Sequence, residues 1–219
     1  EYQLIADGDE ANAILAIQQM KKALAENKDE LLSPGDLRVC VFGRHLFQPL
    51  FHVRAGGKIT VLPVALNDSE FQFVCDLKSW YDKHKHDLDK TGAEIYLLRN
   101  LSRGPGVGFF EAANFHPDFI LWMLAGGRQT MVFIDPHGLK HEGPGSLKVK
   151  FYEGIKEIER RLADPEIVLE SFILSWTPYH QLQWDNENQA ELEKMHVLFM
   201  TDDRDGYLDK LFGQLATPA

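Results

Sequence analysis

The sequence contains only two cysteines among its 219 residues, Cys40 and Cys75. Two cysteines cannot form a disulfide framework or a zinc knuckle, and each lies in an apolar stretch, which favours buried free thiols. A chain with so few cysteines suits a reducing compartment, so we expect a cytoplasmic protein. No apolar run approaches the roughly 18 residues that span a membrane, and the acidic start has no signal-peptide pattern, so we expect no membrane partner.

Basic residues are also scarce, because 23 Lys and Arg stand against 33 Asp and Glu and the net charge is −10. Binding to nucleic acid needs locally clustered Lys and Arg, so the chain by itself is expected to bind DNA weakly. No Walker A string occurs, so any ATP-driven motor must lie outside this chain. The first residue is not methionine. We interpret the chain as a fragment of a longer protein.

Residues 1–35 are predicted to form an N-terminal helical segment, with the helix over 9–27 and a break at SPGD, 33–36. Residues 36–66 are predicted to form an antiparallel β-ribbon that leads into the core, with AGGK as the turn between its second and third β-leaning runs. The helix over 9–27 and the ribbon are therefore expected to precede the main domain.

Residues 67–219 are predicted to form the core domain, in an α/β or α+β fold with a mixed sheet. A helix begins near Glu70 and ends before the polar segment KHDLDKTGA, and AGGR is a tight turn within an antiparallel meander. The other predicted elements are strands at 94–100, 107–112, 119–124, 129–134, 167–176 and 195–200, and helices at 147–164 and 205–215.

Two aspartates stand at the ends of neighbouring predicted strands: Asp118 opens FILWML and Asp135 closes MVFI. Adjacent antiparallel strands would bring these carboxylates together, and their repulsion needs a compensating charge. Mg²⁺ binds carboxylate oxygens and can activate water for phosphodiester hydrolysis. Each aspartate alone also suits a turn, Asp118 after proline and Asp135 in DPHG. Their joint spacing favours a metal site.

Pro117-Asp118, followed by a strand, a turn and Asp135-x-His137, resembles the PD-(D/E)xK nuclease motif. The longer block LLRNLSRGPGVGFFEAANFHPDFILWMLAGGRQTMVFIDPHGL, with the upstream VLPVALNDSEFQFVCDL, resembles the C-terminal nuclease domain of helicase-linked enzymes of the type III restriction family. The similarity covers about residues 40 to 200. It implies a restriction-endonuclease-like core.

The resemblance also implies site residues. It places Mg²⁺, or Mn²⁺ as a substitute, on Asp118, Asp135 and Glu70, with His137 completing the catalytic set. Glu70 alone could be a first-turn acid that favours the helix dipole, and Glu111 competes for its place. The alternatives for both acids stay open at this stage.

His137 stands where the resembled motif has lysine. A histidine there could act as a general base, keep a reduced electrostatic role, or mark a weakened enzyme, and Lys140 could supply the missing charge. The polar groups Arg99, Asn100 and Arg103 are expected to bind phosphates beside the site, or else to occupy an exposed hairpin. The best basic patch, which could also be a solvated helix face, consists of Lys148, Lys150, Lys156, Arg160 and Arg161.

The sequence therefore predicts a Mg²⁺-dependent DNA endonuclease domain, the cutting module of a helicase or translocase in restriction or phage defence. The DNA and a fused or associated motor are the expected partners. The alternative is a module that keeps the nuclease fold, has lost turnover, and serves DNA binding or complex assembly.

Overall fold

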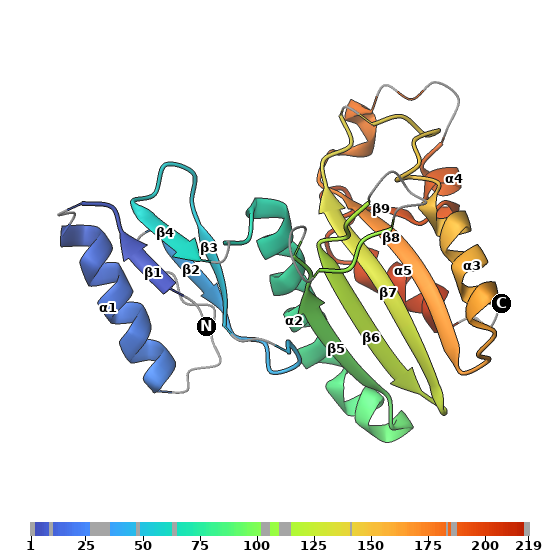
Figure 1. The fold of residues 1–219 in the computed structure, drawn as a ribbon, viewed down its shortest axis with the longest axis horizontal. Helices are drawn as coiled ribbons and strands as arrows, with labels where there is room; N and C mark the ends of the chain where they lie inside the picture. The colour runs from blue at the N-terminus through green and yellow to red at the C-terminus, as the bar shows by residue number, and fades with distance from the viewer. Residues whose placement is uncertain are drawn as a thin grey trace. The chain divides into compact units, whose positions relative to one another are not determined.

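The computed structural model has a mixed α/β architecture and describes residues 3–8, 11–26, 36–46, 49–62, 65–101, 106–109, 115–140, 142–182, 184 and 188–216. The chain divides into two units, Glu1–Lys78 and Ser79–Ala219 (Figure 1). The division falls inside one helix, α2 (Asp68–Thr91). Within the described residues, no helix is long and apolar enough to cross a membrane.

In the described residues, the first unit contains helix α1 (Ala11–Ala25), the start of α2 and two small antiparallel sheets. Helix α1 confirms the predicted N-terminal helix. Strand β1 (Gln3–Ala6) pairs with β4 (Ile59–Leu62), and β2 (Leu37–Cys40) pairs with β3 (Leu50–Val53). One core holds these elements together, and it contains Ala13, Ala16, Met20, Leu37, Val39, Phe51, Ile59 and Val61. The helix and the ribbon strands thus share one core.

The predicted ribbon is only partly correct. Gly57 N donates to Arg54 O at 2.9 Å and Gly56 has φ of +80°, so the turn is present. The strands on its two sides do not form a ladder with each other, because β3 pairs with β2 and β4 pairs with β1. Strand β1 was not predicted, since its four residues carry no turn signals or alternation of their own.

Helix α2 begins with a reciprocal cap. Asn67 Oδ1 accepts a hydrogen bond from Glu70 N at 2.9 Å, and Glu70 Oε2 accepts one from Asn67 N at 2.8 Å. This arrangement satisfies backbone donors that the first turn leaves unpaired. The helix runs beyond its predicted end to Thr91, where Gly92 adopts φ of +68°. The prediction ended it too early, because polar residues alone do not stop a helix and a left-handed glycine does.

The second unit is built on a five-stranded mixed sheet with the order β5-β6-β7-β8-β9 (Figure 1). The strands are β5 (Glu94–Arg99), β6 (Phe119–Ala125), β7 (Arg128–His137), β8 (Ile167–Ser175) and β9 (Val197–Phe199). Neighbours are antiparallel from β5 to β7 and parallel from β7 to β9. The predicted mixed sheet is confirmed.

The β6–β7 hairpin closes through Gly126 and Gly127, whose φ values are +59° and +81°. Positive φ at both central residues is the type I′ turn, which matches the twist of the flanking strands. The predicted tight turn is therefore confirmed. The predicted strand over 107–112 is not present in its described part, where Phe109 forms only an isolated bridge with Phe115. Residues 110–112 lie outside the described residues, and β5 pairs directly with β6.

Three helices belong to the second unit besides the end of α2. Helices α3 (Phe151–Leu162) and α5 (Tyr207–Ala216) confirm two predictions, whereas α4 (Gln189–Lys194) and a 3₁₀ turn at Tyr179–Gln181 were not predicted. Helix α3 lies alongside β8 (Figure 1). One face of the sheet packs against it through Ile120, Phe133, Leu169, Phe151 and Ile155.

Side chains cover the outer edge of β8 where β9 does not reach. In the described part of the chain, β9 pairs only with Ile173–Ser175. Below that point Glu159 Oε2 accepts a hydrogen bond from Leu169 N at 2.6 Å. His196 Nδ1 donates to Ser171 O at 3.1 Å, with φ of +59° at His196. The backbone groups of an otherwise open strand edge are thus satisfied.

We expect the free energy of unfolding to fall as the pH drops below about 6.5, the ordinary histidine pKa. Burial, followed by the Arg38 charge, lowers the pKa of His52, and burial lowers the pKa of His196 against the opposing Glu170 carboxylate. The unfolded chain then binds protons that the folded chain excludes, so stability is present above that pH and lost below it. Urea denaturation at pH 7.5, 6.0 and 5.0 measures this.

A matched pair of variants locates the effect. His52→Gln should flatten part of the pH dependence, whereas replacing the exposed His86 with Gln should leave it unchanged. An unfolding free energy that rises toward pH 5 would contradict the assignment.

Candidate functional site

The two aspartates predicted as metal ligands lie opposite each other in the backbone register. Phe119 pairs with Ile134, so continuing the antiparallel ladder by one residue sets Asp118 opposite Asp135. On its other side, Asp118 O accepts a hydrogen bond from Asn100 N at 2.7 Å. Alternation along each strand puts Asp118 on the face of Ile120 and Asp135 on the face of Phe133, which is the α3 face. Both carboxylates thus belong to one corner of the sheet.

Asp135 is a strand residue, and the alternative of a DPHG turn is wrong. Strand β7 continues through His137, with Asp135 opposite Ile173 and His137 opposite Ser175 in the parallel ladder with β8. Pro136, which has no N–H, falls beyond the end of β6, where no ladder partner on that side needs its donor. The carboxyl ends of parallel strands are where open α/β sheets place ligands.

The Asp135 carboxylate is buried, with 3% of the residue exposed. Its Oδ2 atom forms an ion pair with Lys148 Nζ. The same oxygen has no hydrogen bond of ordinary geometry to the described residues. The ion pair offsets the cost of burying this carboxylate, which without a nearby cation would be strongly destabilised. The described partner of Asp135 Oδ2 is therefore the charged ammonium of Lys148.

Lys148 reaches this oxygen from the turn that leads into α3. Its ammonium also lies over the Phe115 ring, 5.7 Å from the centroid. Phe115 packs edge-on against Phe151, and Phe109 packs against Phe133 and Phe151. The Lys148 ammonium therefore lies against a cluster of aromatic rings on the α3 side of the sheet.

His137 follows Asp135 at the exposed end of β7. Although the side chain is exposed, partial desolvation and then the Lys148 charge lower its pKa, against the Asp135 and Glu142 carboxylates. The imidazole is therefore mainly neutral at pH 7. A permanent positive charge at this corner comes from Lys148 and not from His137.

Asn100 has a structural role in place of the predicted phosphate contact. It is buried, and its Nδ2 donates to Val107 O at 2.7 Å and to Pro117 O at 2.8 Å. Its Oδ1 accepts from Val107 N at 2.8 Å. Both amide hydrogens are used, so none is left for a phosphate. Asn100 holds Pro117 next to Asp118 and closes the segment that returns to β6.

The other predicted site residues lie in different surroundings. The guanidinium of Arg99 lies over the Phe119 ring at 5.8 Å, beside the corner, and Lys140 is exposed just beyond β7. Arg103 and Glu111 lie outside the described residues. Glu70 belongs to the first unit, where it is buried and completes the α2 cap. Its cap explains the residue structurally, and its role as a third ligand stays a prediction.

The donors at the corner fit a magnesium ion. The described residues contain no group of three or more His, Cys, Asp or Glu side chains placed to hold a metal. Mg²⁺ does not need one, because it commonly binds one or two carboxylates and completes its shell with water and substrate phosphate oxygens. Asp118 and Asp135 supply hard oxygen donors, and a metal ion at Asp135 Oδ2 would share that oxygen with the Lys148 ammonium.

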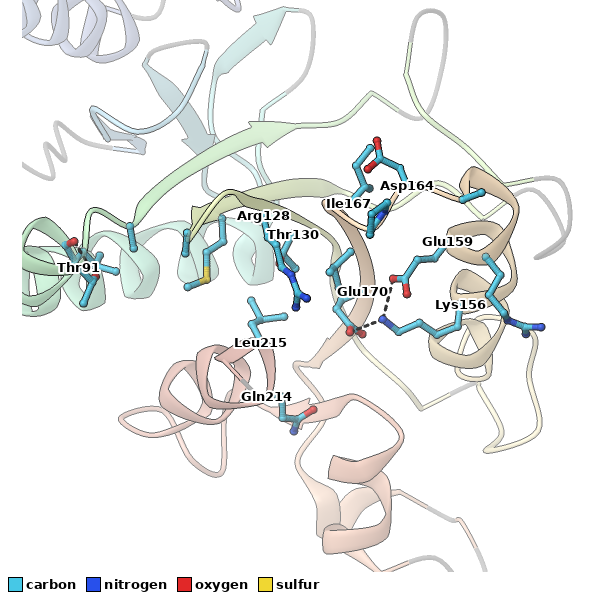
Figure 2. A pocket seen from close by; sticks show the side chains of 18 residues that line it. Thr91, Arg128, Thr130, Lys156, Glu159, Asp164, Ile167, Glu170, Gln214 and Leu215 are labelled. Atoms are coloured by element: carbon cyan, nitrogen blue, oxygen red, sulfur yellow. Dashed lines mark hydrogen bonds and ion pairs between the residues drawn. The ribbon is translucent and has the colours of Figure 1, made fainter. Parts of the chain in front are cut away.

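A large cavity of the second unit lies at the other end of the same strands. It has a volume of about 880 Å³ and is lined by Arg128 at the start of β7. Arg128 and Asp135 are separated by roughly 23 Å along the strand. Figure 2 shows Lys156 extending from α3 toward Glu170 of β8, with bonds of 3.0 Å to Glu159 and 2.7 Å to Glu170. Lys156, Glu159 and Glu170 are thus paired with each other. The corner brings together the two predicted metal-binding aspartates, so it is the better candidate for chemistry.

Comparison with protein-family models, curated proteins and solved structures finds no match to this chain. The resemblance to restriction-type nucleases therefore rests on the motif residues and their placement in the sheet.

Proposed function

We propose that this chain is a Mg²⁺-dependent DNA endonuclease domain that hydrolyses phosphodiester bonds at the corner formed by Asp118 and Asp135. The observation that carries the proposal is their facing position in the register, with a buried Asp135 and a lysine ammonium beside it. Paired carboxylates and a cation at the carboxyl end of parallel strands suit recognition of a metal and a phosphate together.

Different side chains of the corner would have different roles in the reaction. Asp118 and Asp135 would hold the ion, which when bound would polarise a phosphate oxygen and lower the pKa of an attacking water. His137, mainly neutral and exposed at the mouth of the corner, can accept a proton from that water. Asn100 fixes the backbone next to Asp118, so that this carboxylate needs little reorganisation.

DNA delivery is proposed to come from a helicase or translocase, fused to or associated with this domain in the cytoplasm. The support is the net charge of −10, since an acidic domain binds a polyanion weakly without help. ATP would act only through that motor.

A second candidate function is a module that binds or assembles without cutting. Lys148 favours it, because its ammonium already neutralises Asp135 and could make the pair purely structural. The two functions differ in whether DNA is cleaved when metal is supplied.

The deciding experiment is cleavage of supercoiled and linear duplex DNA by the purified chain, with Mg²⁺ or Mn²⁺ and with EDTA. We expect metal-dependent nicking or cutting that EDTA abolishes and that added salt suppresses by weakening DNA binding. An inert chain, both alone and joined to its motor, would leave the assembly module as the function.

A further inference from the structure

We infer that Lys148, and not a residue of strand β7, supplies the positive charge of the proposed nuclease site. The resembled motif places a lysine two residues after the second acid, and this chain has His137 there. The structure brings Lys148 Nζ into an ion pair with Asp135 from a separate segment. This inference rests on the proposed function, because a cationic group has a role in cleavage only if the corner binds DNA.

The backbone around Lys148 is fixed by burial of the residues that follow it and by hydrogen bonds within the turn. Val149 and Phe151, one and three residues after it in the chain, are 2% and 3% exposed. Ser146 Oγ accepts a hydrogen bond from Val149 N at 3.2 Å, and Lys150 N donates to Ser146 O at 3.0 Å. These anchors fix the turn that carries Lys148.

The direction of the side chain is set from both ends. Its ammonium lies over the Phe115 ring, 5.7 Å from the ring centroid, and forms the ion pair with Asp135 on the α3 face of the sheet. About 20% of the Lys148 side chain is exposed, so the charge is largely desolvated beside the proposed site. A partly desolvated charge acts more strongly on a phosphate than a fully solvated one such as Lys140.

Two opposite effects follow from this position. The ammonium competes with a metal ion for Asp135 Oδ2, which weakens metal binding. The same ammonium would stabilise negative charge that develops on the scissile phosphate, which speeds cleavage. Removing Lys148 should therefore tighten metal binding and slow the reaction, a combination that a merely structural lysine would not produce.

The test compares Lys148→Met and Lys148→Arg with the wild-type chain. Methionine removes the charge, and arginine keeps it. Single-turnover DNA cleavage gives the rate, and electron paramagnetic resonance of free Mn²⁺ gives the metal affinity. We expect Lys148→Met to cut on the order of 100-fold more slowly and to bind Mn²⁺ severalfold more tightly, and Lys148→Arg to recover part of the rate.

Lys85→Met, which removes an equal charge from the exposed surface of α2, should match the wild type in both measurements.

If Lys148→Met cuts at the wild-type rate, or if Lys140→Met loses the activity instead, the inference is wrong while the proposed function stands. The inference is also wrong if Lys148→Met lowers the cleavage rate, leaves Mn²⁺ affinity unchanged or weaker, and is not rescued by Lys148→Arg. That result would mean that Lys148 has only a structural role. If the methionine variant does not fold, Lys148→Gln takes its place. A wild-type chain that never cuts DNA overturns the proposed function and this inference together.

Discussion

Replacing Asp118 or Asp135 with asparagine is expected to lower Mg²⁺-dependent DNA cleavage on the order of 1000-fold while the chain stays folded. The two residues lie opposite each other when the β6–β7 register is continued by one residue, so each carboxylate would supply negative charge to the same proposed ion. Asparagine keeps the shape and removes the charge. Cleavage rates with Mg²⁺ and Mn²⁺, together with urea denaturation of each variant, measure the effect.

Glu70→Gln belongs in the same experiment, because glutamine can replace glutamate in the cap of α2. A loss of cleavage in this variant without a loss of stability would make Glu70 the third ligand. Unchanged cleavage would leave it as a capping residue. Wild-type cleavage by the Asp118→Asn, Asp135→Asn double variant, in preparations free of other nucleases, would remove the corner from the reaction altogether.

Asn100→Asp is expected to lower the free energy of unfolding by about 3 kcal/mol or more, although aspartate has nearly the same shape. The substitution turns the donor to Val107 O and Pro117 O into an oxygen, which sets acceptors against each other in a buried place. Urea denaturation reports the loss. The cleavage rate should fall as well, because the aspartate can no longer donate to Pro117 O and hold the backbone next to Asp118.

Asn100→Ala provides the comparison. It removes all three side-chain hydrogen bonds without adding a charge, so it should destabilise by about 3 kcal/mol, close to the lower bound for aspartate. Equal stability of wild type and both variants would show that the hydrogen bonds seen at Asn100 contribute nothing. A phosphate-binding Asn100 would instead give normal stability with weaker DNA binding.

The elements that were predicted well carry their signals locally. The β6–β7 hairpin contains two glycines where the type I′ turn needs positive φ, and α3 has an apolar stripe that matches the sheet face. Errors arose where partners lie far away in the chain. Strand β1 depends on β4 for its pairing. The described part of the strand predicted over 107–112 is not paired with β5, because β5 pairs with β6.

The candidate site divides in the same way. The facing of Asp118 and Asp135 could be predicted, since adjacent antiparallel strands with a short turn fix their register. The role of Lys148 could not, because only tertiary packing of the segment before α3 brings it to Asp135. In sequence it was one of five basic residues near a helix. The sequence predicts a phosphate contact or an exposed hairpin for Asn100, because a polar segment follows it. The structure buries it, and its side chain forms hydrogen bonds with Val107 and Pro117.

The edge of β8 has a consequence for association between molecules. Glu159 and His196 occupy backbone groups of Leu169 and Ser171 that would otherwise accept a strand from another copy. The protection comes from two side chains and not from a further strand, so a single substitution at Glu159 can open the edge while the corner some distance along the sheet stays intact. A Glu159→Ala variant is therefore expected to self-associate more readily than the wild-type chain. A fall in DNA cleavage by such a variant would then report loss of soluble protein and not a role of Glu159 at the proposed site.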